Sequence, residues 1–350
     1  ATTRISGPGF IVINVQRFSR LEKNRAGAAR RCHSSEQTVV RGYAPPARAS
    51  RARMRPLAPL ETRLMAFRYE MTAPGVENVR RVEGESTGPG PGQVQVRIRA
   101  SSLNYHDYIT LTGLIPWIGY PRVPLSDGCG EISAVGAGVE GFAVGDRVLT
   151  TFYPLWHAGR PSRESKRLIL GETTDGCLQE YLDIDARSVA RAPANLDDAA
   201  AATLVCAGHT AWYALAEECR LRAGQTVLVQ GSGGVSVFAL QIAKAIGAKV
   251  VATSSSDEKL ERMRELGADW LVNYRTHPDW EREVLRLCGG VDATIDVGGE
   301  ATLARAVACA NTDGHNACGV RTKHFSPRQH KLPLASTTTA SASRAHNASA

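Results

Sequence analysis

Apolar and polar residues alternate along residues 93–99, QVQVRIR, and this pattern predicts a strand with one buried face. The glycine- and proline-rich residues 89–92 predict a turn just before that strand. Two further short strands are predicted over residues 130–136 and 145–150, and both are bounded by glycine. Many short strands separated by glycine and proline turns are typical of a small β-barrel, which we expect over residues 65–190.

The pattern changes after about residue 195. Residues 226–230 and 249–253 are short apolar runs, and each is followed by a longer stretch in which apolar positions have helical spacing. The same order recurs up to residue 296. Strands that alternate with helices predict a parallel sheet with crossover helices. We therefore expect an α/β domain of the doubly wound Rossmann type over residues 195–310.

Both ends of the chain lack such patterns. Residues 1–60 are rich in Arg, Ala and Ser, which favours a disordered extension, with a mitochondrial targeting segment as the alternative. Residues 311–350 are rich in Ser, Thr and Ala, and we expect a disordered, atypical tail there. Because a doubly wound sheet needs further strands after residue 310, the sequence predicts a Rossmann domain truncated at its C-terminal end, with weak stability.

The net charge of +8 is unevenly distributed along the chain. Residues 1–64 carry +10 and residues 311–350 carry +4, whereas residues 65–310 carry −6. A mildly acidic body lacks the basic face of a nucleic-acid-binding protein, so no nucleic-acid partner is expected. No apolar run reaches the length of about 18 residues that a membrane span needs. The eight cysteines are scattered without a C-x-x-C pair, which favours reduced thiols and a cytoplasmic protein.

The most specific chemical feature is a glycine-rich loop between a predicted strand and a predicted helix. Gly231 allows a tight turn, Gly233 lets backbone amides approach a pyrophosphate, and the following helix N-terminus provides free N–H groups and positive potential. The third position of the fingerprint is Ser236, which is small enough for close packing. The loop therefore predicts dinucleotide binding by Gly231, Ser232, Gly233, Gly234 and Val235.

Residues after the second strand of this domain favour NADP(H). A domain that binds NAD(H) usually has an acidic residue there, which holds the ribose 2′-hydroxyl. Here that place is occupied by hydroxyl residues, with a cation just beyond them. We predict that Ser254, Ser255 and Lys259 bind a 2′-phosphate. Asp257 lies close by and is the residue that would favour NAD(H) instead.

Five segments in order resemble the medium-chain dehydrogenase/reductase superfamily, in particular its zinc-free quinone oxidoreductase-like members. They are residues 91–97, 136–148, 206–212, 231–244 and 265–269. The resemblance implies a GroES-like catalytic domain followed by the Rossmann domain, with a small-molecule substrate in the cleft between them. It also implies a homodimer, which the atypical tail puts in question for this chain, and adds Tyr274 and Thr210 to the cofactor-binding residues.

Zinc-dependent alcohol dehydrogenases of this superfamily bind a catalytic zinc through Cys, His and Cys. The resemblance places Asn104 at the first of these positions and Asp127 at the second, and it retains Cys206 at the third. One thiol and one carboxylate make a poor zinc site, since such sites normally have three protein ligands. We therefore expect no metal, and a zinc-dependent alcohol dehydrogenase that uses Asp127 and Cys206 is the alternative.

Without zinc, hydrogen bonds must activate the electrophile and a side chain or water must supply the proton. We predict Asn104, Tyr105, His106 and Asp127 as catalytic residues; a core tyrosine, a surface histidine and a turn carboxylate are the ordinary alternatives. The predicted reaction is NADPH-dependent hydride transfer to a quinone or an α,β-unsaturated carbonyl compound, as in an enoyl reductase. A truncated, non-catalytic member of the family is a second alternative.

Overall fold

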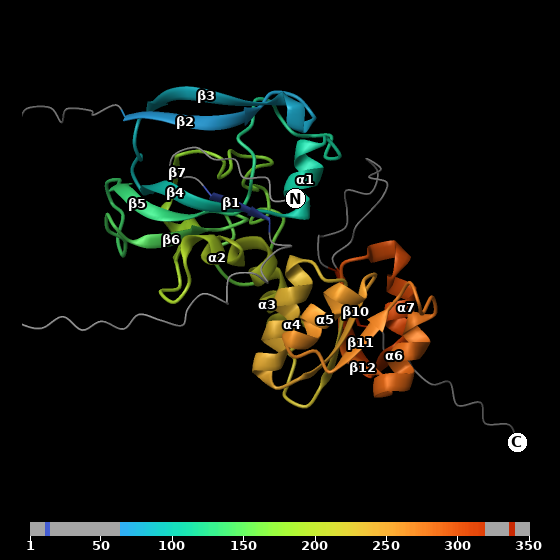
Figure 1. The fold of residues 1–350 in the computed structure, drawn as a ribbon. Coiled ribbons are helices and arrows are strands. Elements are labelled where there is room, and N and C mark those ends of the chain that lie inside the picture. The colour runs from blue at the N-terminus through green and yellow to red at the C-terminus, as the bar shows by residue number, and fades with distance from the viewer. Residues whose placement is uncertain (1–10, 15–63, 319–335, 340–350) are drawn as a thin grey trace, which may run out of the picture.

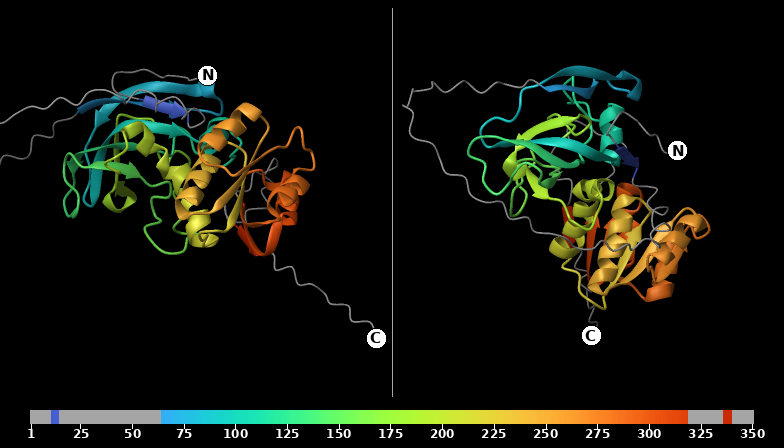
Figure 2. Two further views of the ribbon diagram at one scale, coloured as in Figure 1. Left: turned by 60° about the horizontal axis from the view of Figure 1, so that its bottom comes forward. Right: turned by 60° about the vertical axis from the view of Figure 1, so that its left-hand side comes forward.

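The computed structural model describes residues 11–14, 64–318 and 336–339. Figure 1 shows a β-rich N-terminal domain, blue to green, beside an α/β domain, yellow to red. The two views in Figure 2 place the helices that begin the second domain between the two bodies. No helix in the described ranges is long and apolar enough to cross a membrane.

The N-terminal domain consists of a six-stranded sheet and a two-stranded sheet. In the larger sheet the order is β1-β4-β5-β6-β8 with β7 also paired to β4, and the smaller sheet is β2-β3. The elements are β1 (Ile11–Asn14), β2 (Leu64–Met71), β3 (Val79–Ser86), β4 (Gln93–Leu103), α1 (Tyr105–Leu111), β5 (Cys129–Val135), β6 (Arg147–Thr150), β7 (Tyr181–Asp185) and β8 (Val189–Arg191). The many short strands predicted for this region are therefore present.

Strand β4 is the centre of this domain. Val94, Val96 and Ile98 are buried and pack against strands β5, β6 and β7, as the alternating pattern predicted. Gln95 departs from the pattern because it is buried as well. Its amide donates to Ser86 Oγ over 2.8 Å and to Asp183 Oδ1 over 3.0 Å, and these bonds offset the cost of burying a polar group.

The α/β domain is a parallel sheet with helices on both faces. The strand order is β11-β10-β9-β12-β13-β14, and only β14 is antiparallel to its neighbour. The elements are α2 (Asp198–Ala202), η5 (Leu204–Gly208), α3 (His209–Trp212), η6 (Tyr213–Glu218), β9 (Thr226–Gln230), α4 (Gly234–Ile246), β10 (Lys249–Ser254), α5 (Asp257–Glu265), β11 (Trp270–Asn273), α6 (Trp280–Cys288), β12 (Val291–Asp296), α7 (Leu303–Ala308), β13 (Ala310–Cys318) and β14 (Ser336–Thr339). The predicted α/β architecture is confirmed.

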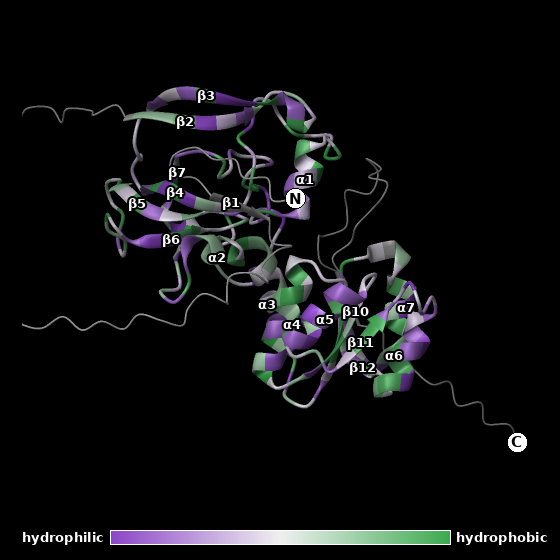
Figure 3. Ribbon diagram, in the orientation of Figure 1, coloured by the Kyte–Doolittle hydropathy of each residue, from purple (hydrophilic) through white to green (hydrophobic). Residues whose placement is uncertain are grey.

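Both faces of the sheet are covered, which explains why its strands are continuous apolar runs. Helices α4 and α5 and the η6 turn pack on one face, which includes Val227 and Val229 of β9. Helices α6 and α7 pack on the other face against Leu228 of the same strand. In Figure 3 the ribbon of α5 is largely hydrophilic, whereas that of β11 in the sheet is hydrophobic.

Two sequence predictions are wrong at the ends of the chain. Residues 11–14 form β1, which pairs in parallel with β4, so this part of the predicted extension is a strand. Residues 310–318 form β13, a fifth parallel strand, so the predicted tail and truncation are wrong there, and residues 336–339 form β14. The remaining residues of the predicted extension and tail lie outside the described ranges.

Strand β13 places an unusual polar residue in the interior. Asn316 is buried beside Thr294 of β12, and both atoms of its amide group lack a hydrogen-bond partner in the described part of the chain. We expect Asn316→Val to raise the free energy of unfolding by roughly 1–3 kcal/mol, because it removes an unpaired buried amide. Urea denaturation measures this, with the exposed Thr312→Val on the same strand as the control. Destabilisation by Asn316→Val would contradict the prediction.

Candidate active site

A tight loop between α1 and β5 forms the base of the candidate site. Leu125 is buried and has φ of 73°, a left-handed conformation that is unfavourable for a branched residue. The backbone N–H of Cys177 donates to the Leu125 carbonyl over 2.7 Å. A Cβ atom at Gly176 would overlap this carbonyl oxygen, so glycine is required for the two segments to approach. The loop is therefore held from both sides in one conformation.

Asp107 joins this loop to helix α1. Its Oδ2 accepts the backbone N–H of Asn104 over 2.8 Å, and its Oδ1 accepts that of Ser126 over 3.0 Å. The side chain is buried, with 1% of its surface exposed. Asp107 thereby fixes the position of Asn104 relative to Asp127, a role that sequence reasoning did not assign to it.

Asp127 is fully buried at the centre of the site. Its Oδ2 accepts hydrogen bonds from Ser102 Oγ and from Asn104 Nδ2, the latter over 2.8 Å. Its Oδ1 has no partner in the described residues. Burial and the charge of Asp107 raise the pKa of Asp127 to about 7, although the hydrogen bonds oppose this shift. At neutral pH a substantial fraction of Asp127 is therefore protonated and able to donate a hydrogen bond.

His106 lies on the other side of Asp107. Its Nε2 is 2.7 Å from Glu172 Oε2, and its ring meets the Phe152 ring edge to face with the centroids 5.0 Å apart. Its Nδ1 is 3.9 Å from Asp107 Oδ1, which is too far for a hydrogen bond. Burial lowers the pKa of His106, but Asp107 and Glu172 outweigh it and raise the pKa to about 9. The ring is therefore protonated at neutral pH.

The structure brings together some of the predicted catalytic residues but not all. Asn104 and Asp127 are in direct contact, and His106 is linked to them through Asp107. Tyr105 lies on the exposed side of α1, where its ring is 5.8 Å from that of Tyr108. Tyr120 packs against a separate apolar cluster.

Sequence reasoning missed Glu172, which contacts both His106 and Trp117. The indole Nε1 of Trp117 donates to Glu172 Oε1 over 2.9 Å, and Oε2 accepts from His106. Glu172 is 66 residues from His106 in the chain and lies in an irregular segment. No motif surrounds it, so the sequence held no pattern that would have identified it.

The residues at the superfamily's zinc positions do not form a three-ligand set. Asn104 uses its amide N–H to bind Asp127, and burial raises the pKa of the Cys206 thiol well above its ordinary value. Within the described residues, no group of three His, Cys, Asp or Glu is arranged to hold a metal ion.

The glycine-rich loop has the geometry that dinucleotide binding requires. Gly231 has φ of 77°, and Gly233 precedes the first turn of α4 in an extended conformation. A Cβ atom at Gly233 would meet nothing within 4 Å, so open space lies beside the helix N-terminus. Ser236 is buried and donates to the Gln230 carbonyl over 2.8 Å, which closes the loop onto β9. This edge fits a pyrophosphate.

The residues predicted to bind the 2′-phosphate gather at the same edge of the sheet. The hydroxyl groups of Ser254 and Ser232 lie 3.3 Å apart, and the Ser254 carbonyl accepts the backbone N–H of Tyr274. Ser255 follows directly, and Lys259 lies exposed in the first turns of α5. The segments meet because the carboxyl ends of parallel strands lie at one edge.

Asp257 and Thr210 are the other two residues that the sequence analysis connected with the cofactor. Asp257, the residue that favoured NAD(H), accepts a hydrogen bond from Asn273 Nδ2 over 2.7 Å. Thr210 lies exposed on α3, and Figure 1 shows α3 on the side of the α/β domain that faces the N-terminal domain.

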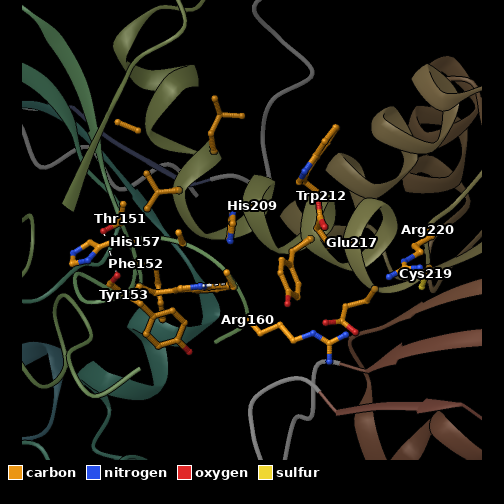
Figure 4. Close-up of a pocket in the computed structure, with 18 of the residues that line it drawn as sticks. Thr151, Phe152, Tyr153, His157, Arg160, His209, Trp212, Glu217, Cys219 and Arg220 are labelled. Carbon is orange, nitrogen blue, oxygen red and sulfur yellow. Dashed lines mark hydrogen bonds between the residues drawn. The ribbon is translucent and has the colours of Figure 1, made fainter. Parts of the chain in front are cut away.

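A pocket of about 1130 Å³ lies between the two domains, and Figure 4 shows side chains from both, among them Tyr153 and His209. Its lining includes Phe152, whose ring contacts His106, but neither Asn104 nor Asp127. It continues toward the amino ends of β9 and β13, away from the glycine-rich loop. The pocket therefore touches the candidate site only at one end.

Two family models match the chain. The alcohol dehydrogenase GroES-like domain matches residues 90–194, and the zinc-binding dehydrogenase domain matches residues 234–335. The second match continues beyond residue 310, where the sequence resemblance was expected to end. The two matches cover most of the two domains seen in the structure.

Curated relatives show the same family. A zinc-type alcohol dehydrogenase-like protein of Schizosaccharomyces pombe is 46% identical over 221 residues, which are 62% of this chain and 64% of that protein. An acryloyl-coenzyme A reductase of Metallosphaera sedula is 38% identical over 168 residues, which are 46% of this chain and 50% of that protein. The chain thus spans between half and two thirds of these two relatives.

Solved structures indicate the same family as the curated relatives. A putative alcohol dehydrogenase of Sinorhizobium meliloti is 42% identical with a TM-score of 0.66, over 71% of this chain and 74% of that chain. The quinone oxidoreductase of Escherichia coli complexed with NADPH is 26% identical with a TM-score of 0.60, over 71% of each chain. The protein therefore belongs to the medium-chain dehydrogenase/reductase superfamily, among its zinc-type alcohol dehydrogenase-like members.

Proposed function

We propose that this protein is an NADPH-dependent reductase that acts, without a catalytic zinc, on a quinone or on the alkene of an α,β-unsaturated carbonyl compound. The observation that carries the proposal is the buried Asp127–Asn104 pair beside the cationic His106, at the positions where the superfamily's zinc enzymes bind metal. Hydrogen-bond donors stand where a Lewis acid would otherwise be.

These hydrogen-bond donors suit the reduction of a conjugated alkene better than the oxidation of a simple alcohol. Bound NADPH supplies a hydride, and addition of hydride to a conjugated alkene leaves negative charge on the carbonyl oxygen of the substrate. His106, protonated at neutral pH, is the group that we propose to donate a hydrogen bond to that oxygen, with Asp127 buried behind it. Oxidation of a simple alcohol generates an alkoxide, for which a metal ion is the usual stabilising group.

The names of the relatives support the reduction of an alkene or a quinone. One is named an acryloyl-coenzyme A reductase, and solved structures of similar fold include quinone oxidoreductases. We expect the protein to oxidise NADPH with an enone or a quinone at the same rate before and after treatment with a metal chelator. A requirement for added zinc would contradict the proposal and favour the alternative, a zinc-dependent alcohol dehydrogenase.

The preference for NADPH depends on the edge formed by Ser254, Ser255 and Lys259. We expect Lys259→Ala to weaken NADPH binding by roughly tenfold, because one charge-assisted hydrogen bond to the 2′-phosphate is lost. Binding of NADH, which lacks that phosphate, should not change. Fluorescence titration with both nucleotides measures this, with Arg264→Ala on the same helix as a control of equal charge change. An equal loss for both nucleotides would contradict the assignment.

A further inference from the structure

Glu172 is a buried acid that the proposed chemistry does not yet use. It has 4% of its surface exposed, yet both oxygens are engaged: Oε1 accepts from the Trp117 indole and Oε2 from the His106 imidazole. Hydrogen bonds to a charged carboxylate are shorter and stronger than neutral ones. The His106 ring is thereby held by one of its two nitrogens.

The backbone around Glu172 is fixed by the same loop that carries Asp127. Gly171 has φ of 78°, and a Cβ atom there would lie 2.7 Å from the Leu125 backbone nitrogen. The turn closes through a hydrogen bond from Gly171 N–H to the Thr174 carbonyl over 2.9 Å. Glu172 and Asp127 are therefore parts of one rigid unit, although 45 positions separate them in the sequence.

The other ring nitrogen of His106 has different surroundings. Nδ1 is buried and has no hydrogen-bond partner in the described part of the chain. Asp107 faces it from 3.9 Å, and Asp127 lies behind Asp107 on the neighbouring loop. On the remaining side lies Phe152, followed in the chain by Tyr153, and burial raises the pKa of the Tyr153 hydroxyl well above its ordinary value.

We propose that Glu172 is a positioning residue, which binds His106 Nε2 so that the Nδ1–H group is presented to the substrate oxygen. This inference rests on the proposed function. In that step the Nδ1–H bond breaks as an O–H bond forms on the substrate, and the N–H electron pair stays on the ring. Hydride and proton together complete the two-electron reduction to an enol or a hydroquinone, and solvent returns a proton to the ring.

The Glu172→Gln variant tests this role because it keeps the size of the side chain and removes its charge. We expect kcat to fall at least about tenfold, as for other residues that orient a reacting group, while the KM for NADPH stays unchanged. The upper pH limit of kcat and the NMR titration of His106 should both move to lower pH. Glu172→Asp, which keeps the charge, should restore part of the rate.

Glu131→Gln is the matched control, since Glu131 is an exposed acid paired with Arg99. Wild-type kcat and an unchanged His106 titration in Glu172→Gln would overturn the inference and leave the proposed function intact. Absence of NADPH-dependent reduction in the wild-type chain would instead contradict the proposed function. If Glu172→Gln fails to fold, the wild-type titration still decides: a His106 ring that loses its proton near its ordinary pKa would overturn the inference.

Discussion

A Gly233→Val variant is expected to lose NADPH binding by at least roughly 100-fold and to keep the stability of the wild type. The extended conformation of Gly233 is one that valine adopts easily, and a Cβ atom there meets nothing within 4 Å. The added methyl groups therefore enter open space beside the N-terminus of α4. That space is where a pyrophosphate must lie to reach the helix N–H groups.

Isothermal titration with NADPH and thermal unfolding measure the two halves of this prediction. Gly84→Val is the control, because Gly84 is exposed on β3 and also has no atom within 4 Å of an added Cβ. Equal loss of stability and binding would mean that the fold has been damaged. Undiminished binding in Gly233→Val would show that the pyrophosphate does not lie at this loop.

The second large effect is expected at His106. His106→Gln should lower kcat by about 10²–10⁴, the usual contribution of a positioned general acid, and leave the Kd of NADPH unchanged. Because Asp107 and Glu172 raise the pKa of His106 to about 9, the wild-type ring is protonated below that pH and loses its proton above it. Wild-type kcat should therefore fall as pH rises through about 9, and this fall should be absent in the variant.

Steady-state rates from neutral to alkaline pH provide the test. His277→Gln, at an exposed histidine beside Thr276, is the matched control and should leave the rates unchanged. If His106→Gln keeps wild-type kcat, the proton reaches the substrate from another group, and the role assigned to His106 is wrong.

The parallel sheet could be predicted because each of its strands and helices has its own pattern of apolar residues in the sequence. Strands β9 and β10 are buried on both faces, so their central residues are apolar, and the helices after them keep helical spacing. Strand β13 could not be predicted, because its sequence ANTDGHNAC has few apolar or β-branched residues. It forms a strand through its backbone hydrogen bonds to β12, and such tertiary pairing has no trace in the local pattern.

The two halves of the candidate site also differ in how far their arrangement could be predicted from the sequence. The nucleotide edge could be predicted because its residues follow successive strands, whose carboxyl ends must meet. In the catalytic half, adjacency in sequence did not reveal which side chains face inward. Tyr105 and Tyr108, three residues apart, share the exposed face of α1, whereas His106 and Asp107 face inward.

The position of the transferred hydride tests the central claim most directly. The chelator-treated full chain is supplied with NADPH that carries deuterium at its transferable position and with a cyclic enone, and the product is analysed by NMR. Deuterium on the carbon β to the carbonyl, with turnover independent of zinc, is the result that zinc-free alkene reduction predicts. Deuterium on the carbonyl carbon, with turnover lost on removing zinc and restored on adding it, would contradict it.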